Sequence, residues 1–533
     1  MGEEGLNLAA QVCWNCKNGK RKCSKDIPAC ARCSKLLLKC DYEYSAAEMN
    51  ASKAGQSPAS SVECSTFPQL QSTSKLMHAL SDDCPKSIRL EASIPNQVLN
   101  IIISNGDGVP SITSTYFRTI DVWLPVISAD CCVQRLERIT QDNNVELAGL
   151  LLCMFLVTRP PAHNGGVKDM QTALYYETKT LYTFLVSSGK SSIEIIQAGL
   201  LMGLYEIGHG MTEASQITMA VCLRMAMKMK AVQFRNNSAN IQNTEFGRLW
   251  WGIVTLDRYM NQDLPPDEIH LLVGSWSDGV PSMELPVDEE ALQGLPPPIS
   301  MRTTSGISAS HQPTTRLGPF CRAAEAGHLL GQVLDIIAHS SYSREVDFEK
   351  SRALDHAMQS FAMVLVQQAI NGWEECCAAI GLCLSAMILL HEKTWNLCND
   401  TPGSETRKEA AGMALSSAIR MTVDISRRFH MDLAFIDLPA LPLPATYAIY
   451  RATLLYIKFS GDNFQSLEWS ANMDSLKSTL GHFAKRWSVG KHYLELIDIA
   501  IANESKMRVQ ASERAEFFGN QMHSKDLRME MCD

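Results

Sequence analysis

Residues 13–40 read CWNCKNGKRKCSKDIPACARCSKLLLKC, and their cysteines fall into two halves with the same internal spacing, C-x2-C-x6-C. The halves are Cys13, Cys16 and Cys23, followed by Cys30, Cys33 and Cys40. A structural zinc site takes four ligands. Six thiolates therefore complete two zinc sites only if two of them bridge the metals, whereas a single zinc leaves two thiols unused. The spacing predicts a cluster of two Zn2+ ions held by six cysteines.

The same segment is basic, although the chain as a whole carries a formal charge of −9. Residues 11–40 contain one acid, Asp26, against Lys17, Lys20, Arg21, Lys22, Lys25, Arg32, Lys35 and Lys39. Metal-bound cysteine is deprotonated, so six thiolates and two zinc ions subtract about two charges and leave the segment basic. A compact basic segment on an acidic chain is typical of nucleic-acid binding. Contacts to phosphates make such binding salt-dependent.

The cysteine spacing, the basic run of residues 17–22 and Pro28 resemble the fungal Zn2Cys6 DNA-binding transcription factors over residues 11–44. The resemblance implies that Cys13 and Cys30 bridge the two zinc ions. It also implies that a short helix after Cys16 enters the major groove of double-stranded DNA at sites of the CGG type. We therefore expect a small Zn2Cys6 DNA-binding module in residues 11–44.

The resemblance also assigns roles to the basic residues that follow Cys16. Lys20 matches the lysine that reads bases in the family, and a lysine suits the O6 and N7 acceptors of guanine. Phosphate contacts position a protein without reading sequence. They are expected from the other basic side chains of this stretch, which are Lys17, Arg21, Lys22 and Lys25.

Two departures from the family pattern keep other interpretations open. Gly19 replaces a common arginine or lysine, and Arg21 replaces a common aliphatic residue. A glycine inside a helical turn costs about 1 kcal/mol relative to alanine, and here it also removes a possible DNA contact. The alternatives are a co-regulator whose cluster does not read DNA sequence, and a metal-responsive protein, because thiolates also suit Cu(I). The basic residues between the ligands favour DNA binding.

The remainder of the chain has the composition of a domain with a large core, since 46% of all residues are hydrophobic and 20% are charged. Its further cysteines show no second metal spacing. The N-terminus has no secretory signal, and the longest apolar run, residues 148–157, is about half the length needed to cross a bilayer. We expect a nuclear protein without membrane association.

Residues 45–94 are expected to form a flexible linker, because serine and alanine are frequent there and periodic apolar residues are lacking. The larger apolar residues of this segment fit no heptad. The sequence therefore predicts no coiled coil in the linker. Binding as a monomer and a homodimer formed through the helical domain both remain open.

Residues 95–511 have apolar residues at three- and four-residue spacing, which predicts an all-α domain. Helices are expected at 146–157, 170–187, 193–207, 214–230 and 245–260, and again across 317–397 and 405–511. A proline- and serine-rich stretch predicts a mobile loop at about 294–316. Residues 512–533 are expected to form a polar tail.

Part of this domain resembles the fungal-specific transcription-factor regulatory domain. The matching residues are Tyr116-Phe117, Trp123-Leu124-Pro125, the segment EFGRLWWGIVTLDR at 245–258 and Glu284-Leu285-Pro286. The resemblance implies an all-α regulatory module in the middle of the chain.

No motif in the sequence supports an enzyme. Gly189-Lys190-Ser191 is similar to the end of a phosphate-binding loop, but Phe184 occupies the place of the required earlier glycine. His209, between two glycines, is interpreted as a helix-terminal residue. The methionine-rich run 219–229 is interpreted as core packing or as the lining of a ligand pocket.

The sequence thus predicts a transcriptional regulator that binds CGG-type DNA and works with the transcription machinery. Family analogy favours an activator of a pathway-specific gene set, either a secondary-metabolite cluster or a nutrient pathway.

Overall fold

The computed structural model describes two parts of the chain. In the N-terminal part it describes residues 9, 11–13, 16–17, 21–26, 29–35 and 40. In the remainder it describes residues 87–161, 166–235, 245–273, 285–286, 317–343, 348–369, 373–399, 404–461 and 464–529. The chain divides into two compact units, Met1–Gln71 and Ser72–Asp533. The mobile loop predicted at 294–316 lies outside the described residues. The same holds for residues 45–86 of the predicted linker 45–94.

The small unit contains helix α2 (Ala31–Lys35). Its described residues hold four fully buried side chains, all of them cysteines: Cys13, Cys16, Cys30 and Cys33. Cys23 and Cys40 are partly buried and pack against these four. Among the described residues of this unit, the buried side chains therefore carry sulfur.

The first half of the large unit consists of helices packed around α8 (Val145–Thr158) and α11 (Ile193–Gly208). The surrounding helices are α5 (Ser87–Ser104), α6 (Val109–Thr119), α7 (Ala129–Leu136), α9 (Val167–Met170), α10 (Ala173–Ser187), α12 (Thr212–Arg235) and α13 (Glu245–Asn261). Helix α8 is apolar on all sides and contacts α5, α6, α10 and α11. A helix without a polar face is stable only where other helices surround it, which explains its central place.

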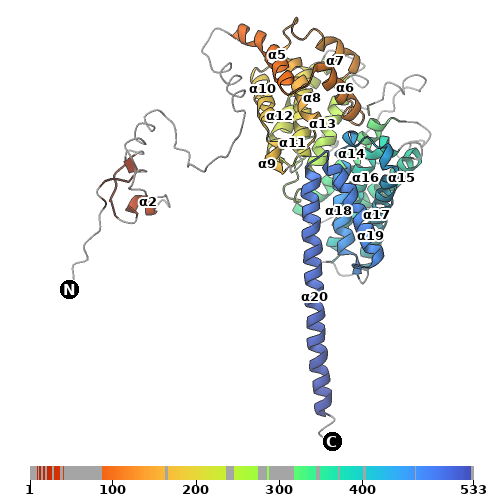
Figure 1. The fold of residues 1–533 in the computed structure, drawn as a ribbon. Helices are drawn as coiled ribbons and strands as arrows, with labels where there is room; N and C mark the ends of the chain where they lie inside the picture. The colour runs from red at the N-terminus through yellow and green to blue at the C-terminus, as the bar shows by residue number, and fades with distance from the viewer. Residues whose placement is uncertain are drawn as a thin grey trace, which may run out of the picture. The chain divides into compact units, whose positions relative to one another are not determined.

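The second half is arranged around α16 (Trp373–Asn399), which packs on α14, α15, α17 and α18 (Figure 1). Its other elements are α14 (Pro319–Ser343), α15 (Phe348–Ala369), α17 (Glu405–Asp432), η5 (Leu433–Phe435), η6 (Leu438–Ala440), α18 (Ala445–Lys458), α19 (Leu467–Ala484) and α20 (Val489–Met529). The stretch Cys376–Cys398 is long and apolar enough to cross a membrane, but 78% of its most apolar window is buried among these helices. That burial is the pattern of a core helix.

The two halves of the large unit share one hydrophobic core. Polar contacts also join them. The Tyr259 hydroxyl lies 2.6 Å from Thr446 Oγ1, and the Tyr447 hydroxyl donates to the Gln262 carbonyl at 2.7 Å. Arg486 donates to the Val157 carbonyl at 2.6 Å. The chain beyond residue 317 is therefore part of the same folded body as the helices before residue 261.

The predicted all-α fold is confirmed for the described residues of the large unit, which form helices and no strand. The predicted helix 146–157 is observed as α8 and the predicted helix 193–207 as α11. One predicted helix, 170–187, is wrong in its extent, because α9 ends at Met170 and α10 begins at Ala173. Thr172 causes the break: its side chain accepts from the Tyr175 N–H at 3.1 Å and caps a new helix.

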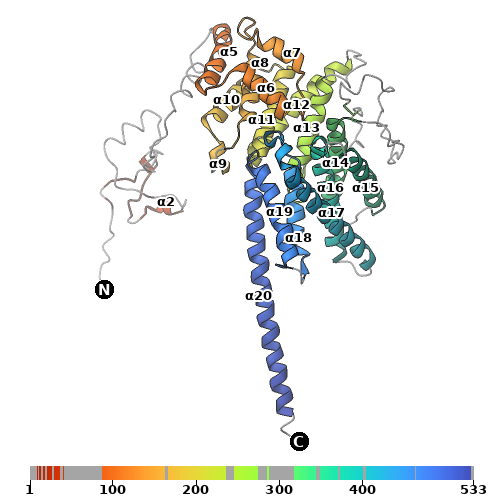
Figure 2. The ribbon, with the colours of Figure 1, turned by 45° about the vertical axis from the view of Figure 1, so that its right-hand side comes forward.

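Two segments that lie outside the expected helical domain are partly helical. Helix α5 begins at Ser87, so the last residues of the expected linker 45–94 are helical. Helix α20 continues to Met529, so most of the expected tail 512–533 is helical as well. Both segments contain arginine, glutamate and alanine, which favour helix formation. In Figures 1 and 2, α20 extends beyond α18 and α19 and projects from the helical body.

Candidate metal centre and nucleic-acid interface

The six cysteines of the small unit lie in two groups of four. One group is Cys13, Cys16, Cys23 and Cys30, and the other is Cys13, Cys30, Cys33 and Cys40. Within each group all Sγ atoms lie within 4.8 Å of one another. Cys13 and Cys30 belong to both groups, and they are the pair that the family resemblance implies as bridging ligands.

The distances between sulfur atoms fit zinc coordination. A zinc–sulfur bond is about 2.3 Å long, so the edge of a regular ZnS4 tetrahedron is about 3.8 Å. The Sγ–Sγ distance is 3.8 Å for Cys13–Cys30, 3.7 Å for Cys13–Cys33 and 3.7 Å for Cys16–Cys30. All six are free thiols, since a disulfide requires about 2.05 Å. The residues therefore fit two zinc tetrahedra that share the Cys13–Cys30 edge.

The repeated spacing folds into a repeated backbone turn. The Lys17 N–H donates to the Cys13 carbonyl at 3.0 Å, and the Ser34 N–H donates to the Cys30 carbonyl at 2.9 Å. Each bond joins the first cysteine of its half to the residue four positions later, which is a turn of helix. This turn carries the second cysteine of each half back toward the first.

Hydrogen-bond donors from the second half of the cysteine repeat, residues 30–40, point at the sulfur atoms. The Cys30 N–H donates to Cys40 Sγ at 3.3 Å, and the Cys33 N–H donates to Cys30 Sγ at 3.4 Å. Arg32 adds a longer contact of 3.9 Å to Cys16 Sγ. These donors offset part of the negative charge that six thiolates bring, because hydrogen bonding to a charged form favours that form.

The cysteines differ in how readily they ionise. Burial raises the pKa of the Cys30 thiol to about 12 and that of Cys13 further still. Burial also opposes ionisation of Cys23, but hydrogen bonds from the backbone of Cys13 and Lys25 outweigh it and lower its pKa to about 7. Since zinc binds thiolates and releases their protons, loading of this site depends on pH.

The structure describes four of the five side chains expected to contact DNA. Lys17, Arg21 and Lys22 are exposed, and Lys25 is half-buried. Lys25 has a φ of 65°, in the left-handed region that few residues other than glycine adopt. Lys20, the expected base-reading residue, lies outside the described residues, and so does Gly19.

Sequence reasoning missed Ser24. Its hydroxyl oxygen accepts from the Ala31 N–H at the start of α2, at 2.8 Å, and its hydroxyl group donates to Asp26 at 2.6 Å. Ser24 thus ties the loop between the halves to the helix of the second half. The signal was present, because serine commonly caps a helix start, but Ser24 lies seven positions before Ala31 and short-range rules do not reach so far.

In the large unit the motif residues that suggest the regulatory domain are structural. Arg248 Nε donates to the Pro125 carbonyl at 2.8 Å and so joins the two separated motif segments. Asp257 and Arg258 are buried and paired. Arg258 donates to the Val273 carbonyl at 2.5 Å, and Asp257 accepts from the Leu272 N–H at 3.3 Å. The pair fixes the segment that follows α13.

The possible enzyme signals are structural too. Gly189, with a φ of 71°, lies in the turn between α10 and α11. His209 is the residue that ends α11, as predicted, and its Nδ1 accepts from the Ser488 N–H at 3.3 Å. Burial, assisted by the charge of Arg486, lowers the pKa of His209 to about 3. Met219 is fully buried in the core.

Two family models match the chain. The fungal Zn(2)-Cys(6) binuclear cluster domain matches residues 11–48, and the fungal specific transcription factor domain matches residues 113–264. The chain is also similar to "Transcription factor BOA15" of Botryotinia fuckeliana (strain B05.10), with 31% identity over 127 residues. That similarity covers 23% of this chain and 67% of the relative. All three comparisons point to transcription factors and none to an enzyme.

Proposed function

The chain belongs to the fungal Zn2Cys6 transcription factors, and from that premise we propose that it reads CGG-type sites in nuclear DNA and activates a pathway-specific set of genes. The observation that carries the proposal is that the six cysteines form two sets of four, and that both sets contain Cys13 and Cys30. Two zinc ions held by these cysteines would fix the two halves of the small unit relative to each other, and the first half carries exposed basic side chains.

The two halves differ in the residues that they can offer to DNA. Residues 17–22 of the first half read KNGKRK, and residues 34–39 at the equivalent positions of the second half read SKLLLK. Phosphate contacts need the basic side chains, which supply most of the affinity. We infer that the first half faces the DNA, with Lys20 on the guanines and Lys17, Arg21, Lys22 and Lys25 along the phosphates.

Activation of secondary-metabolite or nutrient genes through the transcription machinery rests on the habits of the family. A nuclear location follows from the same premise. A homodimer formed through the large unit, which is helical, is compatible with the proposal. Such a homodimer would select two CGG triplets at a fixed spacing, whereas a monomer would select one triplet.

The test is selection of random duplex DNA by the full zinc-loaded chain at several salt concentrations, repeated after chelation. We expect a CGG-containing motif that disappears without zinc. Lys20→Ala should weaken binding about 5- to 150-fold and relax the preference at guanine, as expected for a lost base contact of about 1–3 kcal/mol. Lys17→Ala should weaken binding to all sequences and lower the salt slope by about 1.

Lys35→Ala is the matched control, because Lys35 is exposed on the second half and should have little effect. A zinc-loaded chain that selects no motif contradicts the proposal and favours the co-regulator whose cluster does not read DNA. Selection that persists unchanged in Lys20→Ala contradicts the role assigned to Lys20.

A further inference from the structure

We propose that a groove between α15, α16 and α17 binds an apolar small molecule that presents one hydrogen-bond acceptor to Arg428. The groove has a volume of about 420 Å³. It lies in residues 362–428, outside the stretch 113–264 that matches the fungal specific transcription factor domain. The proposal therefore does not depend on the DNA-binding function.

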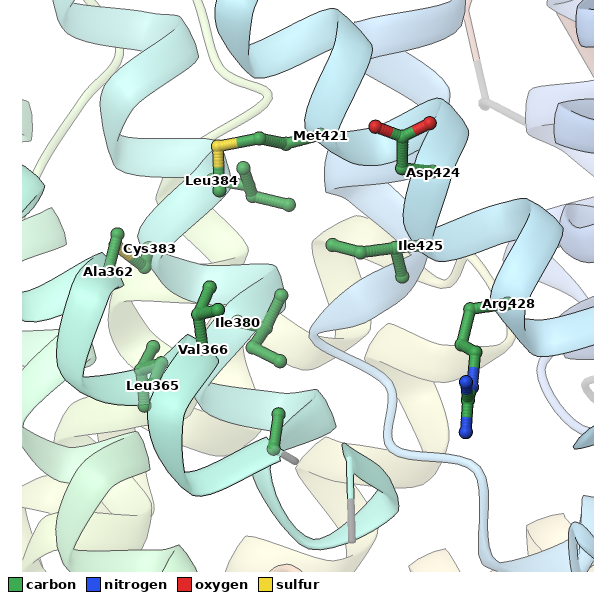
Figure 3. A pocket seen from close by; sticks show the side chains of 11 residues that line it. Ala362, Leu365, Val366, Ile380, Cys383, Leu384, Met421, Asp424, Ile425 and Arg428 are labelled. Atoms are coloured by element: carbon green, nitrogen blue, oxygen red, sulfur yellow. The ribbon is translucent and has the colours of Figure 1, made fainter. Parts of the chain in front are cut away.

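Three helices supply the groove with a floor and two walls (Figure 3). The floor comes from α16 and consists of Ile380, Cys383 and Leu384. The wall from α15 consists of Ala362, Leu365, Val366 and Ala369, and the wall from α17 consists of Met421, Asp424, Ile425 and Arg428. Each wall has the i, i+3, i+4, i+7 spacing of one helix face.

The groove exists because α15 and α17 each pack on α16, and the α15 wall begins and ends with a small side chain. Ala362 and Ala369 leave space that a leucine at either place would fill. Cys383 and Leu384 are buried beneath, whereas Val366 on the wall is 54% exposed. An aliphatic wall left this exposed above an apolar floor is suited to cover by an apolar ligand.

The size of the groove suits a compact ligand. Pockets of about 300–1,000 Å³ with apolar walls and a few polar groups are typical of small-molecule sites. Met421 can adapt one wall to the ligand, because its side chain is flexible and polarizable.

Arg428 defines the polar end of the site. Its Nε donates to Asp432 at 2.6 Å, and a guanidinium has further N–H donors in the same plane. Its side chain is 65% exposed, so it can turn those donors toward the groove. Asp424 has a cationic neighbour of its own, because its carboxylate lies 3.6 Å from the Arg427 guanidinium. An acceptor such as a carbonyl, carboxylate or sulfonate is the group that Arg428 can bind.

The test uses the full zinc-loaded chain and the fluorescent probe 8-anilinonaphthalene-1-sulfonate, which joins apolar rings to one acceptor group. We expect one saturable site per chain. Ala369→Trp fills the groove and should weaken probe binding at least about tenfold. Met363→Trp is the matched control, because Met363 lies on the same helix, is 66% exposed and does not line the groove, and it should bind the probe like the wild type.

A second pair of variants tests the polar end. Arg428→Gln should weaken probe binding about three- to tenfold, as expected for one partly exposed charged hydrogen bond. Arg420→Gln, on the same helix, should not change it, because Arg420 is exposed and does not line the groove. Thermal unfolding followed by circular dichroism verifies that each variant is folded. If Ala369→Trp is unfolded, Val366→Trp replaces it with the same expected loss.

Absence of a saturable site overturns the proposal. So does equal probe affinity in the wild type and in the folded variant with a filled groove. Equal affinity in Arg428→Gln and the wild type overturns the assignment of the polar end.

Discussion

The small unit and the large unit, called the helical unit below, bury different kinds of side chain. Among the described residues of the small unit the buried side chains are cysteines, whereas the helical unit buries a core that extends over nearly all its helices. A segment of about 40 residues cannot hide enough apolar surface to fold alone. Zinc must therefore supply its folding free energy. The difference teaches that ligand spacing specifies one unit and hydrophobic packing the other, so each should respond to its own perturbation.

Removal of zinc should have the largest effect, and it should be confined to the small unit. Structural zinc contributes about 10–16 kcal/mol to the folding of comparable modules. Chelation should therefore unfold the small unit and abolish specific DNA binding, while the helical circular-dichroism signal and its melting temperature stay unchanged. A joint loss of the helical signal would contradict the separation of the two units.

Trp487→Ala is the converse perturbation. The indole is fully buried, and its Nε1–H donates to the Leu441 carbonyl at 2.8 Å. Its loss leaves a cavity and an unpaired carbonyl, and it should lower the free energy of unfolding of the helical unit by about 3–5 kcal/mol. Urea denaturation measures that change, and zinc content should stay the same. Loss of zinc from the folded variant would show that packing also holds the small unit.

Acid should weaken the helical unit through His209. The unfolded chain binds a proton at this histidine near pH 6.5, whereas the folded chain resists protonation until about pH 3. Stability therefore falls as pH decreases below 6.5, by about 2 kcal/mol between pH 7 and pH 5. His209→Gln, which does not titrate, should remove this part of the pH dependence in urea denaturation. An unchanged slope in that variant would contradict a neutral buried His209.

The smallest effect is expected at a helix cap. The Ser466 side chain accepts from the Trp469 N–H at 3.2 Å at the start of α19. Ser466→Ala should lower the free energy of unfolding by about 1 kcal/mol, and Ser466→Asp should retain most of it, since aspartate also caps helices. Thermal unfolding of both variants measures the difference. Equal losses in the two would mean that the cap contributes nothing.

The metal centre was readable from sequence because ligand spacing is local. The equal halves predicted a two-zinc cluster of all six cysteines, and the family resemblance supplied the shared pair Cys13 and Cys30, which the structure places in both groups. The roles of the basic residues, Lys20 above all, stay predictions. The domain boundaries also stay predictions.

Helices of the helical unit could be predicted from the sequence where they have a clear apolar face or are apolar on all sides. Helix α8 was predicted for that reason. The polar part of α20 was not, because its helix formers carry no apolar stripe. The α15–α17 groove could not be predicted either. It depends on Ala362 and Ala369 facing residues of another helix some sixty positions away, and sequence periodicity does not report such pairings.

The most direct test of the central claim is a count of zinc ions by native mass spectrometry of the full chain. The account predicts two zinc ions in the wild type. Cys23→Ala should keep one zinc, because the group Cys13, Cys30, Cys33 and Cys40 stays complete, whereas Cys13→Ala breaks both groups and should disrupt both sites. A single zinc in the wild type, or equal zinc loss in the two variants, would contradict a cluster bridged by Cys13 and Cys30.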